Sequence, residues 1–223
     1  MSFSNRCIKF LLSFAMLAAG QTAWAGCSSA TTSASRTFGS TTISVARDVA
    51  PGTAIGPTYG PYDGTAATIS CSAGTTYLML KFTSTMTASG YTDIYQTNVP
   101  GIGVKAWSDF QNTVYLGNSL KFWYSPGAAF SGGAWITNIH FQFYVIGPVS
   151  TGQVTLPAPI AESWANSVSG STAGGTRYNT LTMTDGISIS AKACTTPSLT
   201  VDLGKHNLYW KKILNDCPAA LPD

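Results

Sequence analysis

Two short stretches of this chain combine aromatic rings with carboxylate and amide groups at close spacing. An aromatic ring offers an apolar face to a sugar ring, and a nearby carboxylate or amide binds the hydroxyl groups. We therefore interpret six residues as candidate ligand-binding residues: Tyr91, Asp93, Trp107, Asp109, Gln111 and Asn112. An alternative interpretation assigns Trp107, together with Trp123, to the hydrophobic core.

Residue patterns typical of catalysis are missing from the sequence. It contains no G-x-S-x-G elbow, no H-E-x-x-H helix motif and no Walker-type phosphate loop. His140 and His206 lie far apart, and the cysteine spacings match no zinc motif, so we expect no metal and no cofactor. A glycosidase needs two carboxylates at a defined separation. The spacing selects no such pair among four acidic residues: Asp93, Asp109, Glu162 and Asp185. We predict a binding protein, with a secreted glycoside-active enzyme as the weaker alternative.

The N-terminal 25 residues have the three regions of a secretory signal peptide. Arg6 and Lys9 precede the apolar stretch FLLSFAMLAA, and small residues follow it, which predicts cleavage before Gly26. The apolar stretch is about half of the roughly 20 residues that a membrane-spanning helix needs. We therefore expect export through the inner membrane without a membrane span. A lipoprotein acylated on Cys27 is an alternative, although Trp24 stands where a lipobox usually has Leu.

The charge balance argues against a nucleic-acid partner. Without Arg6 and Lys9, ten basic residues remain against nine acidic ones. Nucleic-acid binding normally leaves a cluster of Lys and Arg, and the chain offers only the adjacent pair Lys211 and Lys212. Only 9% of the residues are charged, while Gly, Ser, Thr and aromatic residues are abundant. This composition is typical of an exported β protein, with Gly in turns and Thr and aromatic residues in strands.

Hydrophobic residues alternate along most of the chain after residue 26, which predicts an all-β fold. Seven segments read as strands: residues 41–46, 67–72, 77–84, 119–124, 138–147, 152–157 and 181–191. Residues 50–64 and 124–133 are rich in Gly and Pro and read as turns. Residues 159–167 carry the one weak helical pattern. Many short strands separated by turns indicate a β-sandwich of the immunoglobulin-like or jelly-roll kind.

One predicted strand has a clear division between its two faces. Phe141, Phe143 and Val145 alternate with the more polar set His140, Gln142 and Tyr144. This pattern predicts an antiparallel strand with one face in the core and the other toward solvent.

Four cysteines remain after removal of the signal peptide: Cys27, Cys71, Cys194 and Cys217. An even number in an oxidising compartment indicates disulfides, and four cysteines permit three pairings. If Cys194 begins a separate unit, the local solution joins Cys27 to Cys71 and Cys194 to Cys217.

Several segments resemble a known family, in the order in which that family has them. ISVARDVAPGTAIG (43–56), SGYTDIYQTNVPGIGVKA (89–106) and FYVIGPVSTGQVTLP (143–157) resemble the receptor-binding domain of two-domain tip adhesins from bacterial chaperone–usher fimbriae. CTTPSLTVDLG (194–204) and LNDCP (214–218) resemble the start of the pilin domain that follows it. After the signal peptide over 1–25, the resemblance implies a receptor-binding, lectin-like adhesin domain over 26–190 and a truncated pilin domain over 191–223.

The resemblance also implies a function and partners. It implies a fimbrial adhesin that binds host-surface carbohydrate or glycoprotein, exported to the periplasm and then to the fimbrial tip. With a complete pilin domain, a periplasmic chaperone, an usher and fimbrial subunits would be its partners through β-strand addition. Such a domain needs roughly 100 residues, so a fragment, a frameshift and a functional variant remain open. A structural fimbrial subunit without receptor binding is the alternative function.

Overall fold

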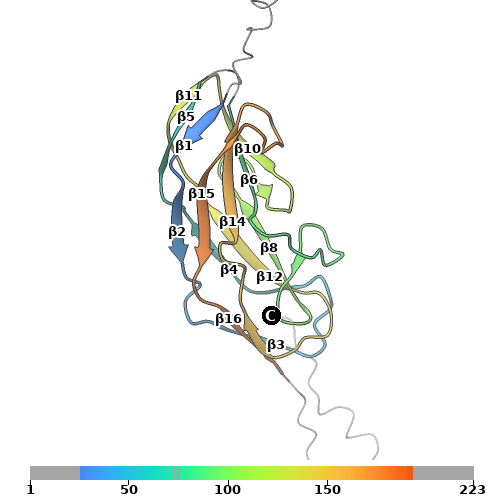
Figure 1. The fold of residues 1–223 in the computed structure, drawn as a ribbon. Coiled ribbons are helices and arrows are strands. Elements are labelled where there is room, and N and C mark those ends of the chain that lie inside the picture. Colours follow the sequence, from blue (N-terminus) through green and yellow to red (C-terminus); the bar gives the residue numbers. More distant parts are fainter. Residues whose placement is uncertain (1–25, 73, 75, 193–223) are drawn as a thin grey trace, which may run out of the picture.

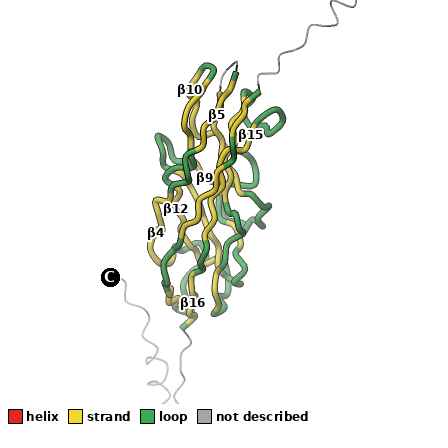
Figure 2. Tube along the Cα trace, turned by 60° about the vertical axis from the view of Figure 1, so that its left-hand side comes forward, coloured by secondary structure: helices red, strands yellow, loops and turns green. Residues whose placement is uncertain are grey.

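The computed structural model describes residues 26–72, 74 and 76–192, and every regular element within them is a β-strand (Figure 1). The strands are β1 (Cys27–Ser29), β2 (Thr32–Arg36), β3 (Thr42–Val45), β4 (Ala54–Tyr62), β5 (Ala67–Cys71), β6 (Thr76–Phe82), β7 (Tyr95–Gln96), β8 (Ile102–Ser108), β9 (Val114–Tyr115), β10 (Lys121–Gly127), β11 (Phe130–Ala134), β12 (Ile139–Val145), β13 (Gly152–Val154), β14 (Ala161–Asn166), β15 (Thr176–Met183) and β16 (Ile187–Ala191). Figure 2 shows these strands running along an elongated body, joined by loops. The predicted all-β fold is confirmed.

Two larger sheets enclose the core as a sandwich. One has the strand order β10-β6-β14-β15-β2, and the other has the order β4-β12-β8-β7, with β9 paired to β8. Their inner faces supply one hydrophobic cluster, in which the Phe82 ring of β6 meets the Tyr95 ring of β7 at 5.0 Å. Two smaller sheets extend the sandwich, with orders β1-β5-β11 and β13-β16-β3. In Figure 1, β1 lies at one end of the body and β16 at the other.

Strand β12 has the two faces that the sequence predicts. Phe141 and Phe143 are fully buried and Val145 is nearly so, because all three point between the sheets. His140 and Tyr144 on the opposite face are partly exposed. Gln142 shares that face but is buried, because it donates from Nε2 to the Ile55 carbonyl at 2.9 Å on the neighbouring strand β4.

Near both ends of the described chain, consecutive strands belong to different sheets, and the two crossings lie side by side. β2 runs parallel to β15, and β3 runs parallel to β16. The prediction of one strand over 181–191 is therefore wrong, because β15 ends at Met183 and β16 begins at Ile187 in another sheet. At the crossing, the Phe38 amide donates to Asp185 Oδ1 at 2.7 Å. A Cβ on Gly186 would lie 2.4 Å from the Val154 carbonyl oxygen, so only glycine fits this bend.

The two segments predicted as turns are also strands in large part. Residues 54–62 form β4, an edge strand whose Gly and Pro residues read as turn signals. An edge position tolerates proline because one side of the strand needs no donors. Gly56 and Gly60 have positive φ, and the pairing of β4 with β12 shifts register twice. Residues 124–133 contain the end of β10 and the start of β11, which join different sheets.

The weak helical pattern over 159–167 corresponds to no helix in the structure. Its central residues form β14, which pairs with β6 on one side and β15 on the other. Glu162 is 4% exposed, and its carboxylate contacts Lys81 Nζ at 3.1 Å and Arg177 Nη1 at 3.4 Å. Pairing on both sides and this ion-pair network outweigh the local pattern, because secondary-structure propensity is weaker than tertiary context.

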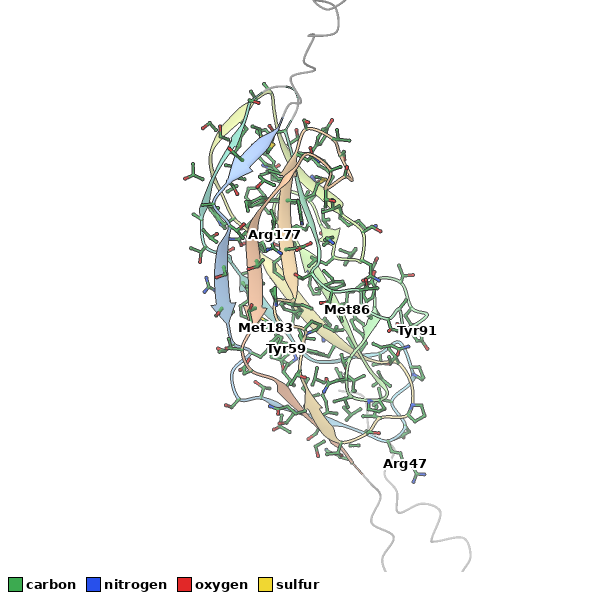
Figure 3. The ribbon with its side chains drawn as sticks, viewed as in Figure 1. Arg47, Tyr59, Met86, Tyr91, Arg177 and Met183 are labelled. Atoms are coloured by element: carbon green, nitrogen blue, oxygen red, sulfur yellow. A yellow bond between two sulfur atoms is a disulfide. The ribbon has the colours of Figure 1, made fainter. Side chains whose placement is uncertain are left out.

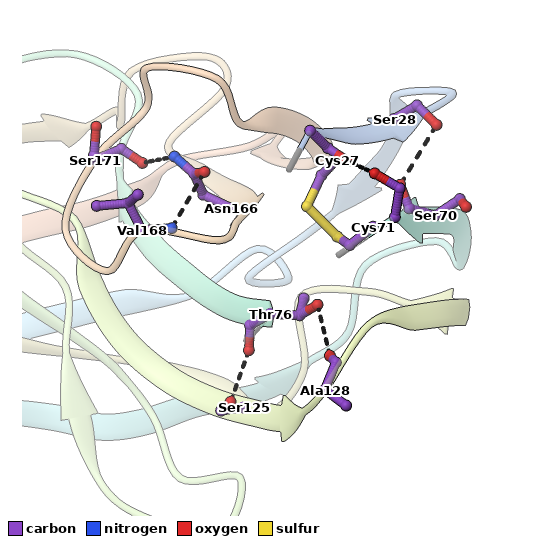
Figure 4. Close-up of a disulfide and its surroundings, with 12 residues drawn as sticks. Cys27, Ser28, Ser70, Cys71, Thr76, Ser125, Ala128, Asn166, Val168 and Ser171 are labelled. Carbon is purple, nitrogen blue, oxygen red and sulfur yellow. Dashed lines mark hydrogen bonds between the residues drawn. A yellow bond between two sulfur atoms is a disulfide. The ribbon is translucent and has the colours of Figure 1, made fainter. Parts of the chain in front are cut away.

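The disulfide prediction is confirmed for Cys27 and Cys71. These residues lie opposite each other in the antiparallel pair β1–β5, and their sulfurs are bonded (Figure 4). The bridge fixes β1 at one end of the sandwich. The predicted Cys194–Cys217 bridge, the signal peptide and the pilin-like segment from residue 193 onward lie outside the described residues.

Candidate functional site

The solvent face of β8 and β12 carries a row of aromatic and charged side chains. Val104 and Ala106 of β8 point into the core, so alternation turns Lys105 and Trp107 outward. In the antiparallel register, Trp107 lies opposite His140. We call this surface the aromatic stripe, and it consists of Lys105, Trp107, Asp109, Tyr115, His140 and Tyr144. From His140 to Tyr144 it extends about 14 Å, at about 3.4 Å per strand residue.

At one end of the stripe, the Trp107 ring is held in place by a stack. The rings of Trp107 and His140 lie 5.4 Å apart with an interplanar angle of 16°. His140 Nε2 is 3.0 Å from Asp109 Oδ2, although this contact lacks the alignment of a hydrogen bond. The His140 side chain is 15% exposed and the Asp109 side chain is 44% exposed. The indole is therefore supported from one side, and the carboxylate remains open to a ligand.

Strand β9 adds Tyr115 to the middle of the stripe. Its ring lies 6.4 Å from the Trp107 ring, and Lys105 Nζ lies 4.4 Å from the Tyr115 ring centroid, a cation–π contact. Burial raises the pKa of the Tyr144 hydroxyl, and nearby Tyr115 raises it further. The Tyr144 hydroxyl therefore remains protonated at neutral pH, and it can donate a hydrogen bond to a ligand.

Among the predicted site residues, Trp107 and Asp109 belong to the stripe. Trp107 is partly exposed on the outer face, so the core assignment is wrong for it. The core assignment is correct for Trp123, which is 5% exposed and meets the Phe110 ring edge-on at 5.3 Å. Gln111 and Asn112 are exposed in the loop between β8 and β9, directly after Asp109.

Tyr91 and Asp93 lie in a turn at the other end of the same sheet face. In this turn the Tyr91 amide donates to Ser89 Oγ at 3.2 Å, and Tyr91 is 40% exposed. Figure 3 shows Tyr91 at the edge of the body. Ile94 then covers Gly103, where a Cβ would lie 2.6 Å from Ile94 Cγ2. Because Gly103 pairs with Tyr144, the turn borders the Tyr144 end of the stripe. The structure thus places the predicted residues in two groups, one at each end of the stripe.

Backbone strain is concentrated around this face. In the described part of the chain, the non-glycine residues with positive φ are Asp93 at 58°, Gln111 at 61° and Asn138 at 51°. Asp93 lies in the turn at one end of the stripe, and Gln111 lies in the loop at the other end. Asn138 lies just before β12, where its carbonyl accepts from the Asp109 amide at 3.4 Å. Such conformations cost free energy and are enriched at ligand-binding loops.

Sequence reasoning missed four residues of the stripe: Lys105, Tyr115, His140 and Tyr144. For His140 and Tyr144 a signal existed, because the alternation in β12 assigns both to the outer face. Lys105 follows from the alternation of β8, which sequence reasoning did not identify as a strand, and the place of Tyr115 depends on the pairing of β8 with β9.

Two further acidic residues have structural partners instead of a place in the stripe. Glu162 is buried against Lys81 and Arg177, and Asp185 accepts from the Phe38 amide.

The described residues contain no group of three or more His, Cys, Asp or Glu side chains arranged to hold a metal ion. Among the same residues, no helix is long and apolar enough to cross a membrane.

Comparison with known proteins finds similarity only at the level of three-dimensional structure. No family model matches the sequence, and no curated protein matches it either. The receptor binding domain of the plasmid-born adhesin MrkD1P of Klebsiella pneumoniae is similar at 18% identity and a TM-score of 0.50, over 77% of this chain and 100% of that one. The CupB6 tip adhesin from Pseudomonas aeruginosa matches at 12% identity and a TM-score of 0.40, over 74% of this chain and 42% of that one. The described domain therefore shares the fold of the MrkD1P receptor binding domain.

Proposed function

We propose that this protein is a fimbrial adhesin whose described domain binds a host-surface carbohydrate or glycoprotein through the aromatic stripe. The observation that carries the proposal is the stripe itself, a partly exposed row of rings with a carboxylate and an ammonium beside them. The fold shared with a receptor binding domain of an adhesin supports it.

The composition of the stripe suits a sugar-bearing ligand. The faces of Trp107, Tyr115 and Tyr144 offer apolar surface to the C–H faces of sugar rings. Asp109 and Lys105 offer charged partners for hydroxyl or acidic groups, and charge-assisted hydrogen bonds are the stronger kind. All residues of the aromatic stripe except Asp109 project from paired strands, which hold side chains more rigidly than loops do.

A paired tryptophan substitution tests the proposed site. Trp107→Ala in the exported chain should weaken binding to glycan arrays or immobilised matrix glycoproteins at least tenfold. Trp135→Ala is the matched control, because Trp135 is 42% exposed next to β11, outside the stripe. Equal binding by both variants, or equal loss in both, would contradict the assignment of the stripe. Mass spectrometry of the recovered glycan should show it intact, and cleavage would favour a glycoside-active enzyme.

The domain organisation and the route of export belong to the same proposal. We propose that residues 1–25 are a signal peptide, that residues 26–190 form the receptor-binding domain and that residues 191–223 begin a pilin-type unit. N-terminal sequencing of the exported protein should give Gly26 as the first residue. Copurification with a periplasmic chaperone tests assembly into a fimbria, and a subunit that assembles without binding any receptor would favour the purely structural role.

A further inference from the structure

A groove separate from the aromatic stripe opens beside β7, with a volume of about 370 Å³. Three segments of three residues form its wall: 85–87 after β6, 96–98 at the end of β7, and 155–157 after β13. We call it the threonine groove. Figure 3 shows Met86, one of its wall residues, about midway along the body on the side that carries Tyr91.

Side-chain amides hold the three segments of the groove in fixed positions. Asn98 accepts from the Thr155 amide and donates to the Gln153 carbonyl, both at 2.9 Å. Asn118 makes the same two-bond clamp on Met86, accepting from its amide and donating to its carbonyl at 2.9 Å each. The Gln96 side chain donates to the Ala88 carbonyl at 3.2 Å. The groove is therefore preorganised, which lowers the entropic cost of binding.

The groove also has unused hydrogen-bonding groups. Thr85, Thr87 and Thr155 are exposed, and in the described part of the chain their hydroxyls make no hydrogen bond to another protein group. Its nine wall residues include no charged side chain. Met86 and Leu156 are 7% and 8% exposed and add an apolar surface.

These features select one class of ligand. An anion would find no positive partner in the wall, and a purely apolar molecule would leave the hydroxyls without partners, which costs free energy. A neutral molecule with hydroxyl groups and a C–H surface can form hydrogen bonds with the threonine hydroxyls and pack against the apolar residues of the wall. The volume lies at the small end of the range for ligand sites, about 300–1,000 Å³.

We propose that the threonine groove binds a neutral saccharide unit, as a site distinct from the aromatic stripe. This inference goes beyond the proposed function, which places receptor binding on the stripe alone. Two separate sites on the domain would contact separate parts of a branched glycan.

The test uses the exported full chain and the methyl glycosides of glucose, galactose, mannose and N-acetylglucosamine. At least one glycoside should shift the backbone amide NMR signals of residues 85–87, 96–98, 155 and 156 in a saturable manner. The double variant Thr87→Val and Thr155→Val keeps the side-chain shape and removes two hydroxyls, so its affinity should fall at least tenfold. Thr68→Val is the matched control, because Thr68 is an exposed threonine on β5 in another sheet.

The outcomes separate this inference from the proposed function. Binding that persists in Trp107→Ala and falls in the double threonine variant supports a separate groove site. Loss in Trp107→Ala with no change in the threonine variant would place the sugar on the stripe and overturn the inference alone. If no glycoside shifts the groove signals, the inference also fails. A groove that binds a glycoside while arrays and matrix proteins give no binding would contradict only the proposed function. Melting curves of each variant identify any loss caused by misfolding.

Discussion

Tyr178 should make this domain unstable at alkaline pH. Its side chain is fully buried in the core on β15, and burial raises its pKa far above the ordinary value of 10.0. The side chains of Ser163 and Trp123 oppose the shift only in part. Within the described residues, the polar side-chain atoms of all three residues lack a well-formed hydrogen bond, so Ser163 and Trp123 stabilise a buried phenolate only weakly.

The sign of the effect follows from proton linkage. Below pH 10 the Tyr178 hydroxyl is protonated in both the folded and the unfolded chain, so it makes no difference to stability. Above pH 10 the unfolded chain loses this proton and the folded chain keeps it. The free energy of unfolding then falls with rising pH, by about 1.4 kcal/mol per pH unit for this one group.

Denaturant unfolding at pH 7, 10 and 11 measures the effect, with Tyr178→Phe as the test variant. The variant keeps the ring, and the lost hydroxyl has no well-formed hydrogen bond, so at pH 7 we expect a change within about 1 kcal/mol. Burial also raises the pKa of Tyr59, Tyr62 and Tyr144, so the parent should retain some pH dependence for those reasons. The variant should nevertheless gain about 1 kcal/mol on the parent between pH 10 and 11, because the unfolded-state hydroxyl is already half ionised at pH 10. The exposed Tyr91→Phe is the control. Parallel stability curves for the parent and Tyr178→Phe up to pH 11 would refute the reasoning.

Three further predictions concern stability. Replacing both Cys27 and Cys71 with Ala opens a loop with a sequence separation of 44, which should cost about 4 kcal/mol of unfolding free energy in denaturant titrations; an unchanged midpoint would contradict this. Phe38→Ala should cost about 3–5 kcal/mol, because its ring packs edge-on at 5.2–6.1 Å against four core rings; a loss below 1 kcal/mol would show that the core collapses around the gap. Gly186→Ala should lower the melting temperature, because its Cβ would clash with the Val154 carbonyl oxygen. An unchanged melting temperature would show that the β13 backbone moves away at little cost in free energy.

The parts of the fold that the sequence predicted correctly are those determined by local alternation. Strands β3, β5, β6 and β12 all show a buried residue at every second position, or nearly so. The errors occurred where the neighbours decide the structure. Strand β4 tolerates Gly and Pro because it is an edge, and β14 tolerates Glu162 because Lys81 and Arg177 neutralise it. Neither partner is visible from the local sequence.

The aromatic stripe depends on the same register as the core. Because side chains alternate with a period of two, a slip of β12 by one residue would exchange its faces. Phe141 and Phe143 would then face water, and His140 and Tyr144 would enter the core without partners. The cost of that exchange fixes which face of the strand points outward. The stripe is therefore held in place by the residues beneath it. Core substitutions such as Phe143→Ala should disturb the proposed glycan binding as well as stability, whereas Trp107→Ala should affect that binding alone.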